Sequence, residues 1–345
     1  MKNRWWRKIL PAVAVWFYTS RFLTGCGPFG DVVLEEDGLE VPSEEEEDLI
    51  VVGFSQIGSE SVWRTANSAS IQNALSRENG FFLEFNNARQ KQENQIKAIR
   101  GFISQRVDYI VFSPVTEDGW ETVLQEAKDA GIPVILVDRK VVVEDESLYT
   151  TWIGSDAEEE GVNAGIWLEE YLAKTGREGE SINIVVLQGT PGASIQLGRT
   201  TGFESVAEKH SNWRILEQKS ADFTNAKGEE VMAQFIRKYQ DIDVVISQND
   251  DMTFGALKAL EANGITTGVN GDVIVISFDA VREALELVAQ GIINVDIECN
   301  PEQGEYIAAI IRKLENGEPV EKENIVDEQI FTPENVEQYL DTRTY

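Results

Sequence analysis

From residue 49 onward, the chain alternates between short apolar runs and longer stretches in which apolar positions recur with helical period. Short runs rich in Val, Ile and Leu are typical of strands that are buried on both faces of a parallel sheet. The predicted strands are Leu49–Ser55, Phe81–Asn86, Tyr109–Ser113 and Pro133–Asp138 in a first group, and Ile182–Gln188, Arg214–Ser220, Val244–Ser247, Val273–Phe278 and Asn294–Glu298 in a second.

The stretches between these strands are predicted helices, and several of them are closed by Gly or by an Asn-Gly pair such as Asn263-Gly264. The predicted helices are Val62–Asn79, Lys91–Gln105, Asp118–Ala130, Ala157–Thr175, Ser194–His210, Ala226–Tyr239, Thr253–Asn263 and Val281–Gln290. Alternating strands and helices in two groups predict an α/β fold of two Rossmann-like, doubly wound parallel-sheet lobes, joined near residues 149–153.

The first residues have the pattern of an export signal. Four basic residues among the first eight precede an apolar stretch, residues 9–18, which is too short to span a bilayer. The following Leu23-Thr24-Gly25-Cys26 resembles the lipobox of bacterial lipoproteins, in which the signal is cut before the cysteine and the thiol receives a diacylglycerol. This resemblance implies a signal peptide over residues 1–25 and lipidation of Cys26. The alternative is an uncleaved signal anchor, and the charged Arg21 departs from the lipobox pattern.

Residues 26–48 are predicted to form an acidic tether. The segment from Asp31 to Asp48 holds ten acidic residues and no basic one. Such a run repels itself and cannot bury a core, so it stays solvated. We expect it to hold the folded body away from an anionic membrane surface.

Composition narrows the function classes further. With 60 acidic against 30 basic residues and a net charge of −30, the chain is a poor ligand for nucleic acid, which needs clustered Lys and Arg. The length of 345 residues suggests two domains, and 42% hydrophobic residues exclude both a multispan membrane protein and a wholly disordered chain. The single histidine, His210, excludes a multi-histidine metal site, and Cys299 is left without a disulfide partner if Cys26 is lipidated. No metal or cofactor is predicted.

Polar side chains end nearly every predicted strand. In open parallel sheets, ligands bind beyond the carboxyl ends of the strands, so these side chains are candidate ligand contacts. They are Ser55, Gln56, Asn86, Ser113, Asp138 and Arg139 in the first lobe, and Gln188, Asp222, Phe223, Asn249, Asp250, Asp279 and Glu298 in the second. Turn formation and helix capping explain part of this pattern, but not Arg139 directly after Asp138, nor aromatic residues in the same loops.

The segment Gly53-Phe-Ser-Gln-Ile-Gly-Ser-Glu-Ser-Val-Trp-Arg64 resembles the opening of the ribose/galactose class of sugar-binding proteins of ABC transporters, above all its galactofuranose-binding members. The resemblance runs from about residue 51 to residue 316. It includes the segments Gln90–Ile96, Val137–Arg139, Gln188–Thr190, Asp222–Thr224 and Asn249–Met252. No DNA-binding headpiece precedes Leu49, which argues against the repressors that share this fold.

The resemblance implies the periplasmic-binding-protein-like I fold, in which three crossovers form a hinge between two lobes and a sugar lies in the cleft. The N-terminal lobe would comprise residues 49–151 and 299–323. The C-terminal lobe would comprise residues 152–298 and 324–345.

The resemblance also implies roles for single residues. Asp138 and Arg139 would bind sugar hydroxyls from the first lobe, Phe223 would pack on the sugar ring, and Glu298 would make a polar contact near the last crossover. The full candidate set is Ser55, Gln56, Trp63, Arg64, Asp138, Arg139, Arg199, Asp222, Phe223, Asn249, Asp279 and Glu298. Carboxylates and guanidinium groups suit hydroxyl edges, and aromatic rings suit the apolar faces of a sugar.

Other interpretations of these residues remain open. Trp63 could pack its helix, Phe223 could belong to the core, and Asp138 with Arg139 could form a structural ion pair at the hinge. Because candidate arginines and carboxylates nearly balance, the ligand is expected to be a neutral monosaccharide rather than a phosphate or a carboxylate.

The function predicted from the sequence is that of an extracytoplasmic, lipid-anchored monomer that captures an aldose and delivers it to an ABC permease. The alternative is a sugar-sensing co-receptor for a membrane kinase or a chemoreceptor. An enzyme is not expected, because His210 lies at a helix end away from the strand-end residues.

Overall fold

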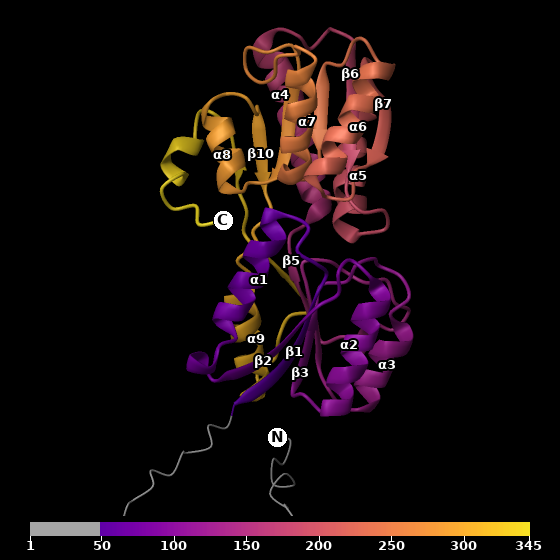
Figure 1. Cartoon of the computed structure of the whole chain (residues 1–345), viewed down its shortest axis with the longest axis vertical. Coiled ribbons are helices and arrows are strands. Elements are labelled where there is room, and N and C mark those ends of the chain that lie inside the picture. Colours follow the sequence, from indigo (N-terminus) through magenta and orange to yellow (C-terminus); the bar gives the residue numbers. More distant parts are fainter. Residues whose placement is uncertain (1–48) are drawn as a thin grey trace, which may run out of the picture. The chain divides into compact units, whose positions relative to one another are not determined.

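The computed structural model describes residues 49–345 (Figure 1). Among these residues, no helix combines the length and the apolar character needed to cross a membrane. The predicted signal peptide, the lipidation of Cys26 and the acidic tether lie outside the described residues.

The first lobe is a parallel sheet with two helices on each face (Figure 1). Its strand order is β11-β5-β4-β3-β1-β2, and its strands are β1 (Ile50–Gln56), β2 (Phe81–Asn87), β3 (Tyr109–Phe112), β4 (Val134–Val137), β5 (Thr151–Gly154) and β11 (Glu323–Ile325). Helices α1 (Val62–Ala74) and α9 (Gly304–Glu315) share one core with the sheet, and α2 (Gln92–Gln105) and α3 (Glu121–Asp129) share the other.

The second lobe repeats this plan with the strand order β12-β10-β9-β8-β6-β7. Its strands are β6 (Ile182–Gln188), β7 (Trp213–Ser220), β8 (Val244–Ser247), β9 (Ile274–Asp279), β10 (Val295–Glu298) and the short antiparallel β12 (Ile330–Phe331). Helices α4 (Ala157–Thr175) and α5 (Ser194–Ala207) cover one face, and α6 (Asn225–Lys238) and α7 (Asp250–Ala262) cover the other. Helix α8 (Arg282–Ala289) packs with the C-terminal residues beside β9.

The chain passes between the lobes three times: from β5 to α4, from β10 to α9, and from β11 to β12. The predicted fold class is therefore confirmed. The strands β5 and β11 both belong to the first sheet, so the chain leaves that sheet after Gly154 and after Ile325. The predicted lobe boundaries, after residues 151 and 323, fall inside these two strands and stay a prediction.

Two local predictions differ from the structure. Helix α1 ends at Ala74 rather than Asn79, because the Asn79 amide donates to the carbonyls of Asn73 and Ala74 and so satisfies the end of the helix. Helix α9 and the strands β5, β11 and β12 were not predicted as elements. The three strands are short, so their local apolar pattern is weak.

Candidate functional site

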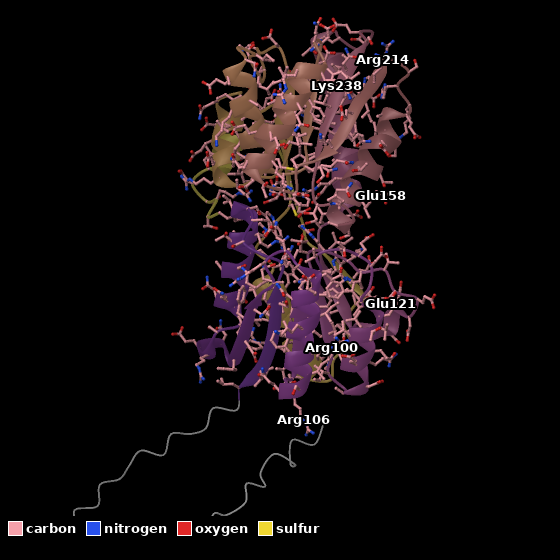
Figure 2. The ribbon with its side chains drawn as sticks, turned by 45° about the vertical axis from the view of Figure 1, so that its right-hand side comes forward. Arg100, Arg106, Glu121, Glu158, Arg214 and Lys238 are labelled. Atoms are coloured by element: carbon pink, nitrogen blue, oxygen red, sulfur yellow. The ribbon has the colours of Figure 1, made fainter. Side chains whose placement is uncertain are left out.

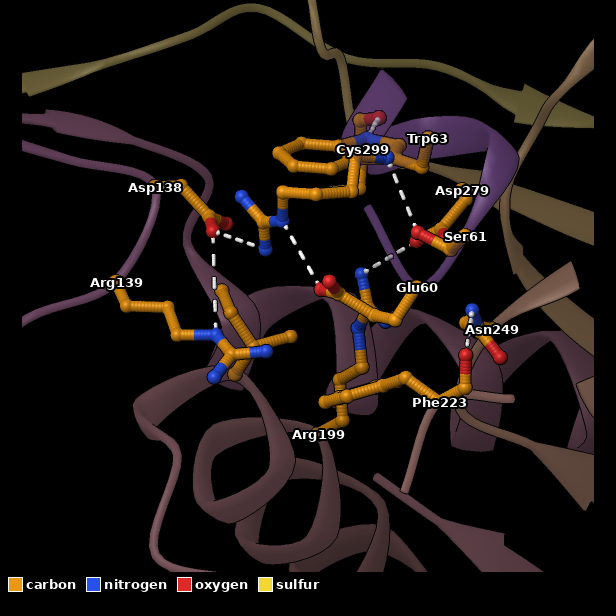
Figure 3. A pocket seen from close by; sticks show the side chains of 12 residues that line it. Glu60, Ser61, Trp63, Asp138, Arg139, Arg199, Phe223, Asn249, Asp279 and Cys299 are labelled. Carbon is orange, nitrogen blue, oxygen red and sulfur yellow. Dashed lines mark hydrogen bonds and ion pairs between the residues drawn. The ribbon is translucent and has the colours of Figure 1, made fainter. Parts of the chain in front are cut away.

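A pocket of about 310 Å³, including space open to solvent, lies between the two lobes (Figure 3). Twelve residues line it: Glu60, Ser61, Trp63, Arg64, Asp138, Arg139, Ile195, Arg199, Phe223, Asn249, Asp279 and Cys299. Apart from Arg199, inside α5, they lie at or beyond the ends of strands or at the starts of helices.

The start of α1 places Arg64 at the centre of the first-lobe wall. Ser61 caps the helix by accepting a hydrogen bond of 3.0 Å from the Arg64 backbone N–H. The Arg64 guanidinium lies 2.7 Å from Asp138 Oδ2 and 3.2 Å from Glu60 Oε1, and it stacks over the Trp63 ring at 4.5 Å. Burial opposes the charge of Arg64, but Asp138 and Glu60 outweigh it and raise its pKa.

Arg139 is held less completely than Arg64. Asp138 takes a left-handed backbone conformation (φ 63°) and accepts a hydrogen bond of 2.9 Å from Ser113 Oγ. Arg139 donates from Nη1 to the carbonyl of Val115 at 2.8 Å, but its Nε is 3.9 Å from Asp138 Oδ2. Burial, together with the positive charge of Arg64, lowers the pKa of Arg139 to about 10. The protein therefore compensates this buried charge only in part.

Arg199 is held completely by the second lobe. Its Nε lies 2.5 Å from Glu160 Oε2, its Nη2 lies 3.3 Å from Asp279 Oδ1, and its Nη1 donates to the carbonyl of Gln248. Burial opposes the charge, but Glu160 and Asp279 outweigh it and raise the pKa of Arg199. Each nitrogen of the Arg199 guanidinium thus has a protein partner. Arg199 therefore holds Glu160, Asp279 and the Gln248 carbonyl in place.

The loops after β7 and β8 bring two further side chains to the pocket. Phe223, after β7, has φ 58°, and its ring covers Gly189, where a Cβ atom would lie 1.9 Å from the ring. Asn249 caps α7 by accepting from the Met252 N–H at 2.9 Å. The Arg139 guanidinium of the other lobe lies over the Phe223 ring at 5.4 Å. Strained backbone of this kind concentrates at functional sites.

Two buried carboxylates hold the loop that follows Asp279. Asp250 accepts from the Val281 N–H at 2.8 Å, and Asp296 accepts from the Ala280 N–H at 3.1 Å. The loop residues Asp279 and Ala280 have φ values of 106° and 58°. Burial raises the pKa of Asp296 to about 7, and burial together with the Asp296 charge raises that of Asp250. Both carboxyl groups therefore hold their protons to a higher pH in the folded protein than in the unfolded chain.

This pair gives stability an unusual pH dependence. The folded protein keeps a proton on Asp296 that the unfolded chain releases near its ordinary pKa of 3.8. The free energy of unfolding should therefore fall as pH rises from about 4 to about 7. Asp296→Asn, which keeps the acceptor for the Ala280 N–H and removes the titrating group, should flatten this fall. Urea denaturation at several pH values measures it, with the exposed Asp341→Asn as the matched control. Equal slopes for Asp296→Asn and the unmodified chain would contradict the raised pKa of Asp296.

Hydrogen bonds join the lobes around the pocket. Glu117 N–H donates to the Gly192 carbonyl at 3.0 Å, and Lys140 N–H donates to Ser194 Oγ at 2.9 Å. The Val62 N–H donates to Asp251 Oδ2 at 2.9 Å. The two walls of the pocket are thus held in contact.

Comparison with known proteins identifies this arrangement. The model of the periplasmic binding protein domain matches residues 52–319. The chain belongs to this family. The galactofuranose-binding protein YtfQ of Escherichia coli (strain K12) is 37% identical over 298 residues, which are 85% of this chain and 91% of that relative.

Two solved structures of binding proteins are also similar. A protein from Mycobacterium smegmatis in complex with β-D-fucofuranose is 42% identical with a TM-score of 0.81, covering 86% of this chain and 95% of that one. The binding protein of the arabinose ABC transporter from Shewanella sp. ANA-3, bound to α- and β-L-arabinofuranose, is 39% identical with a TM-score of 0.79, covering 85% and 95%. The predicted family, and the prediction of a binding protein rather than an enzyme, are confirmed.

Eight of the twelve predicted contacts line the pocket of this periplasmic binding protein: Trp63, Arg64, Asp138, Arg139, Arg199, Phe223, Asn249 and Asp279. Phe223 belongs to a core cluster of the second lobe and also lines the pocket, as one alternative predicted. Trp63, which lies in α1 of the first lobe, packs against a cluster of second-lobe residues rather than within its own lobe, and it also lines the pocket. A direct contact of any of the eight with a ligand stays a prediction.

Four predicted contacts do not line the pocket. Ser55 is fully buried in β1, and Gln56 accepts from the Ile57 N–H and donates to Asn67 inside the first lobe. Asp222 is one third exposed and pairs with Lys227. Glu298 pairs with Arg343 at 2.6 Å and accepts from the Tyr345 hydroxyl at 3.0 Å. The position at a strand end was right for all four. Gln56, Asp222 and Glu298 have other partners, and Ser55 Oγ is buried without a hydrogen-bond partner among the described residues.

Sequence reasoning missed Glu60, Ser61, Ile195 and Cys299 in the pocket lining, and Glu160 behind Arg199. Glu60 lies four residues before Arg64, a spacing that favours an ion pair on one helical face. Ser61 is a typical N-cap residue before a helix. A local sequence pattern therefore marks Glu60 and Ser61. No local pattern marks Ile195, Cys299 or Glu160.

Proposed function

We propose that this chain binds a neutral monosaccharide in the pocket between its lobes. One observation carries the proposal: Glu60 Oε2, Arg64 Nη1 and Arg139 Nε are buried at the pocket and have no hydrogen-bond partner among the described residues. One of these atoms is an acceptor and two are donors. A hydroxyl group both donates and accepts, so adjacent hydroxyls of a sugar satisfy this set.

The charges of the pocket favour a neutral ligand. Arg64, Arg139 and Arg199 stand against Glu60, Asp138 and Asp279, with Glu160 behind Arg199. A phosphate or carboxylate would meet these carboxylates, because no arginine faces the pocket without one nearby. The rings of Trp63 and Phe223 supply apolar surface for the C–H faces of a sugar ring.

The names of related proteins indicate which ring form of the sugar to propose. The names of three related proteins or structures refer to galactofuranose, fucofuranose and arabinofuranose. We therefore propose an aldose in its furanose form, galactofuranose-like, as the ligand of this chain.

Calorimetric titration of the full chain tests the ligand class. The panel contains D-galactose, L-arabinose, D-fucose and D-ribose, with galactose 6-phosphate as the charged comparison. At least one neutral aldose should bind with one-to-one stoichiometry and add about 2.7 kcal/mol of apparent stability at one hundred times its dissociation constant. Tight binding of the phosphate alone, weakened steeply by salt, would contradict the proposal.

We further propose that the protein delivers this sugar to an ABC permease from the outer face of the membrane, held there by lipid on Cys26 as a monomer. Membership of the periplasmic binding protein family and the lipobox-like residues 23–26 support this location. Two acyl chains hold a protein stably, whereas one holds it only marginally.

Replacing Cys26 by Ser tests the anchor. The variant should lose its membrane attachment or keep its signal peptide, because the acylated thiol is gone. Membrane fractionation with mass spectrometry of the N-terminus measures both results, and Cys299→Ser serves as the matched control, which should remain attached. A Cys26→Ser protein that is processed and fully membrane-bound would refute the lipid anchor.

A further inference from the structure

A second group of acids is gathered where the three crossovers meet. Glu160 lies in the first turn of α4, Cys299 follows β10, and Glu328 lies between β11 and β12, so each residue comes from a different crossover region. The Cys299 Sγ and one carboxylate oxygen from each glutamate lie within 4.8 Å of one another. Glu160 and Cys299 are 3% and 2% exposed. Cys299 also lines the pocket, but both glutamates lie outside its lining.

We call Glu160, Cys299 and Glu328 the hinge cluster. Few positively charged groups lie near it. Glu160 Oε2 pairs with Arg199, but Glu160 Oε1 is buried and has no hydrogen-bond partner among the described residues. Glu328 Oε1 accepts from Ser155 Oγ and from the Asn300 N–H. The Ser155 Oγ also lies 3.2 Å from Cys299 Sγ. Arg199 is the only cation in direct contact with the cluster in the described chain, and it is shared with Asp279.

The protonation of the cluster reflects this shortage. Burial, together with the charge of Glu160, raises the pKa of Glu328 to about 9. Burial also raises the pKa values of Glu160 and of the Cys299 thiol. A metal ion such as zinc would have to displace these protons, so zinc affinity should rise with pH.

We propose that the hinge cluster binds one zinc ion through Cys299 Sγ, Glu160 Oε1 and an oxygen of Glu328, with water as the fourth ligand. Zinc accepts thiolate and carboxylate together, and it often binds three protein ligands and a water. A thiolate disfavours magnesium and calcium, which prefer oxygen ligands alone.

The geometry requires only small side-chain movements. Tetrahedral ligands at zinc distances of about 2.0–2.3 Å lie about 3.3–3.8 Å from one another. The ligand atoms of the hinge cluster already lie within 4.8 Å. On binding, the Cys299 thiol and the Glu328 carboxyl group lose their protons to solvent, while Glu160 already pairs with Arg199 as a carboxylate. The ion would then link all three crossovers, and this role does not depend on which ligand fills the pocket.

The experiment uses the full chain with Cys26→Ser, so that Cys299 is the only thiol. Calorimetric titration with zinc chloride in two buffers of different ionisation enthalpy should give one site and net proton release. Cadmium chloride, as a spectroscopic probe, should produce a thiolate-to-metal charge-transfer band in the ultraviolet. Adding Cys299→Ser should abolish the band, and adding Glu328→Gln should weaken zinc binding by about tenfold or more.

Glu158→Gln is the matched control, because Glu158 lies in the same turn of α4 as Glu160 but its side chain is exposed (Figure 2). It should bind zinc like the parent chain. Absence of a charge-transfer band, or a band that persists in Cys299→Ser, would overturn the zinc site. Equal zinc affinity in Glu328→Gln and Glu158→Gln would overturn it as well, and this comparison stands even if Cys299→Ser folds poorly. Sugar binding by the same proteins is measured in separate titrations. The zinc site and the sugar site can therefore be refuted independently of each other.

Discussion

Replacing Arg199 by Met should lower the free energy of unfolding by about 3–5 kcal/mol, the range for breaking a buried ion pair from one side. Arg199 is 2% exposed, and its loss leaves the carboxylates of Glu160 and Asp279 buried without their cation. The burial of Arg199 and the three partners of its guanidinium argue that the fold does not tolerate its removal.

Urea denaturation followed by circular dichroism at pH 7 measures this loss. Two further variants separate charge pairing from lost packing. Arg199→Met combined with Glu160→Gln should recover part of the stability, because the stranded carboxylate becomes neutral. Arg214→Met, at an exposed arginine of β7 (Figure 2), should change stability by no more than about 0.5 kcal/mol. A stability of Arg199→Met equal to that of Arg214→Met would show that the pairing was misread.

Replacing Arg139 by Met should reduce sugar affinity at least about tenfold and change stability much less. The removed interaction is a charge-assisted hydrogen bond, worth about 1.5–3 kcal/mol. Arg139 donates to the Val115 carbonyl, and its Nε has no partner among the described residues. Its lowered pKa, about 10, indicates a buried charge that a ligand oxygen would stabilise. Met keeps an apolar stem of similar length but removes the guanidinium that lies over the Phe223 ring.

Calorimetric titration with the aldose that binds the unmodified chain measures this effect. Arg100→Met is the matched control, because Arg100 lies on the outer face of α2 and pairs only with the exposed Glu126 in the described chain (Figure 2). It should bind sugar normally. If Arg139→Met retained the affinity of Arg100→Met, Arg139 would not contact the ligand. The two replacements are thus expected to affect different measurements. Arg199→Met should lower the free energy of unfolding, and Arg139→Met should lower the affinity for sugar.

Much of the fold was determined by the sequence itself. Buried parallel strands require continuous apolar runs, and these runs are visible without knowledge of their neighbours. Ile182–Gln188, Val244–Ser247 and the helix Ala157–Thr175 have the predicted bounds. The location of the site also followed, because the ends of parallel strands in one sheet lie along one edge. Asp138, Phe223, Asn249 and Asp279 therefore meet at the pocket as expected.

Only the tertiary structure decided which side chains face that pocket and which have partners elsewhere. Glu160 and Arg199 are 39 residues apart, and Glu298 and Arg343 are 45 apart, so no local spacing connects them. Both pairs depend on how helices and crossovers pack. Asp222 and Glu298 lie at strand ends just as Asp138 and Asp279 do. They nevertheless pair with Lys227 and Arg343 and do not line the pocket. A charged side chain that is taken out of water pairs with the nearest available opposite charge, and packing alone determines which charge that is.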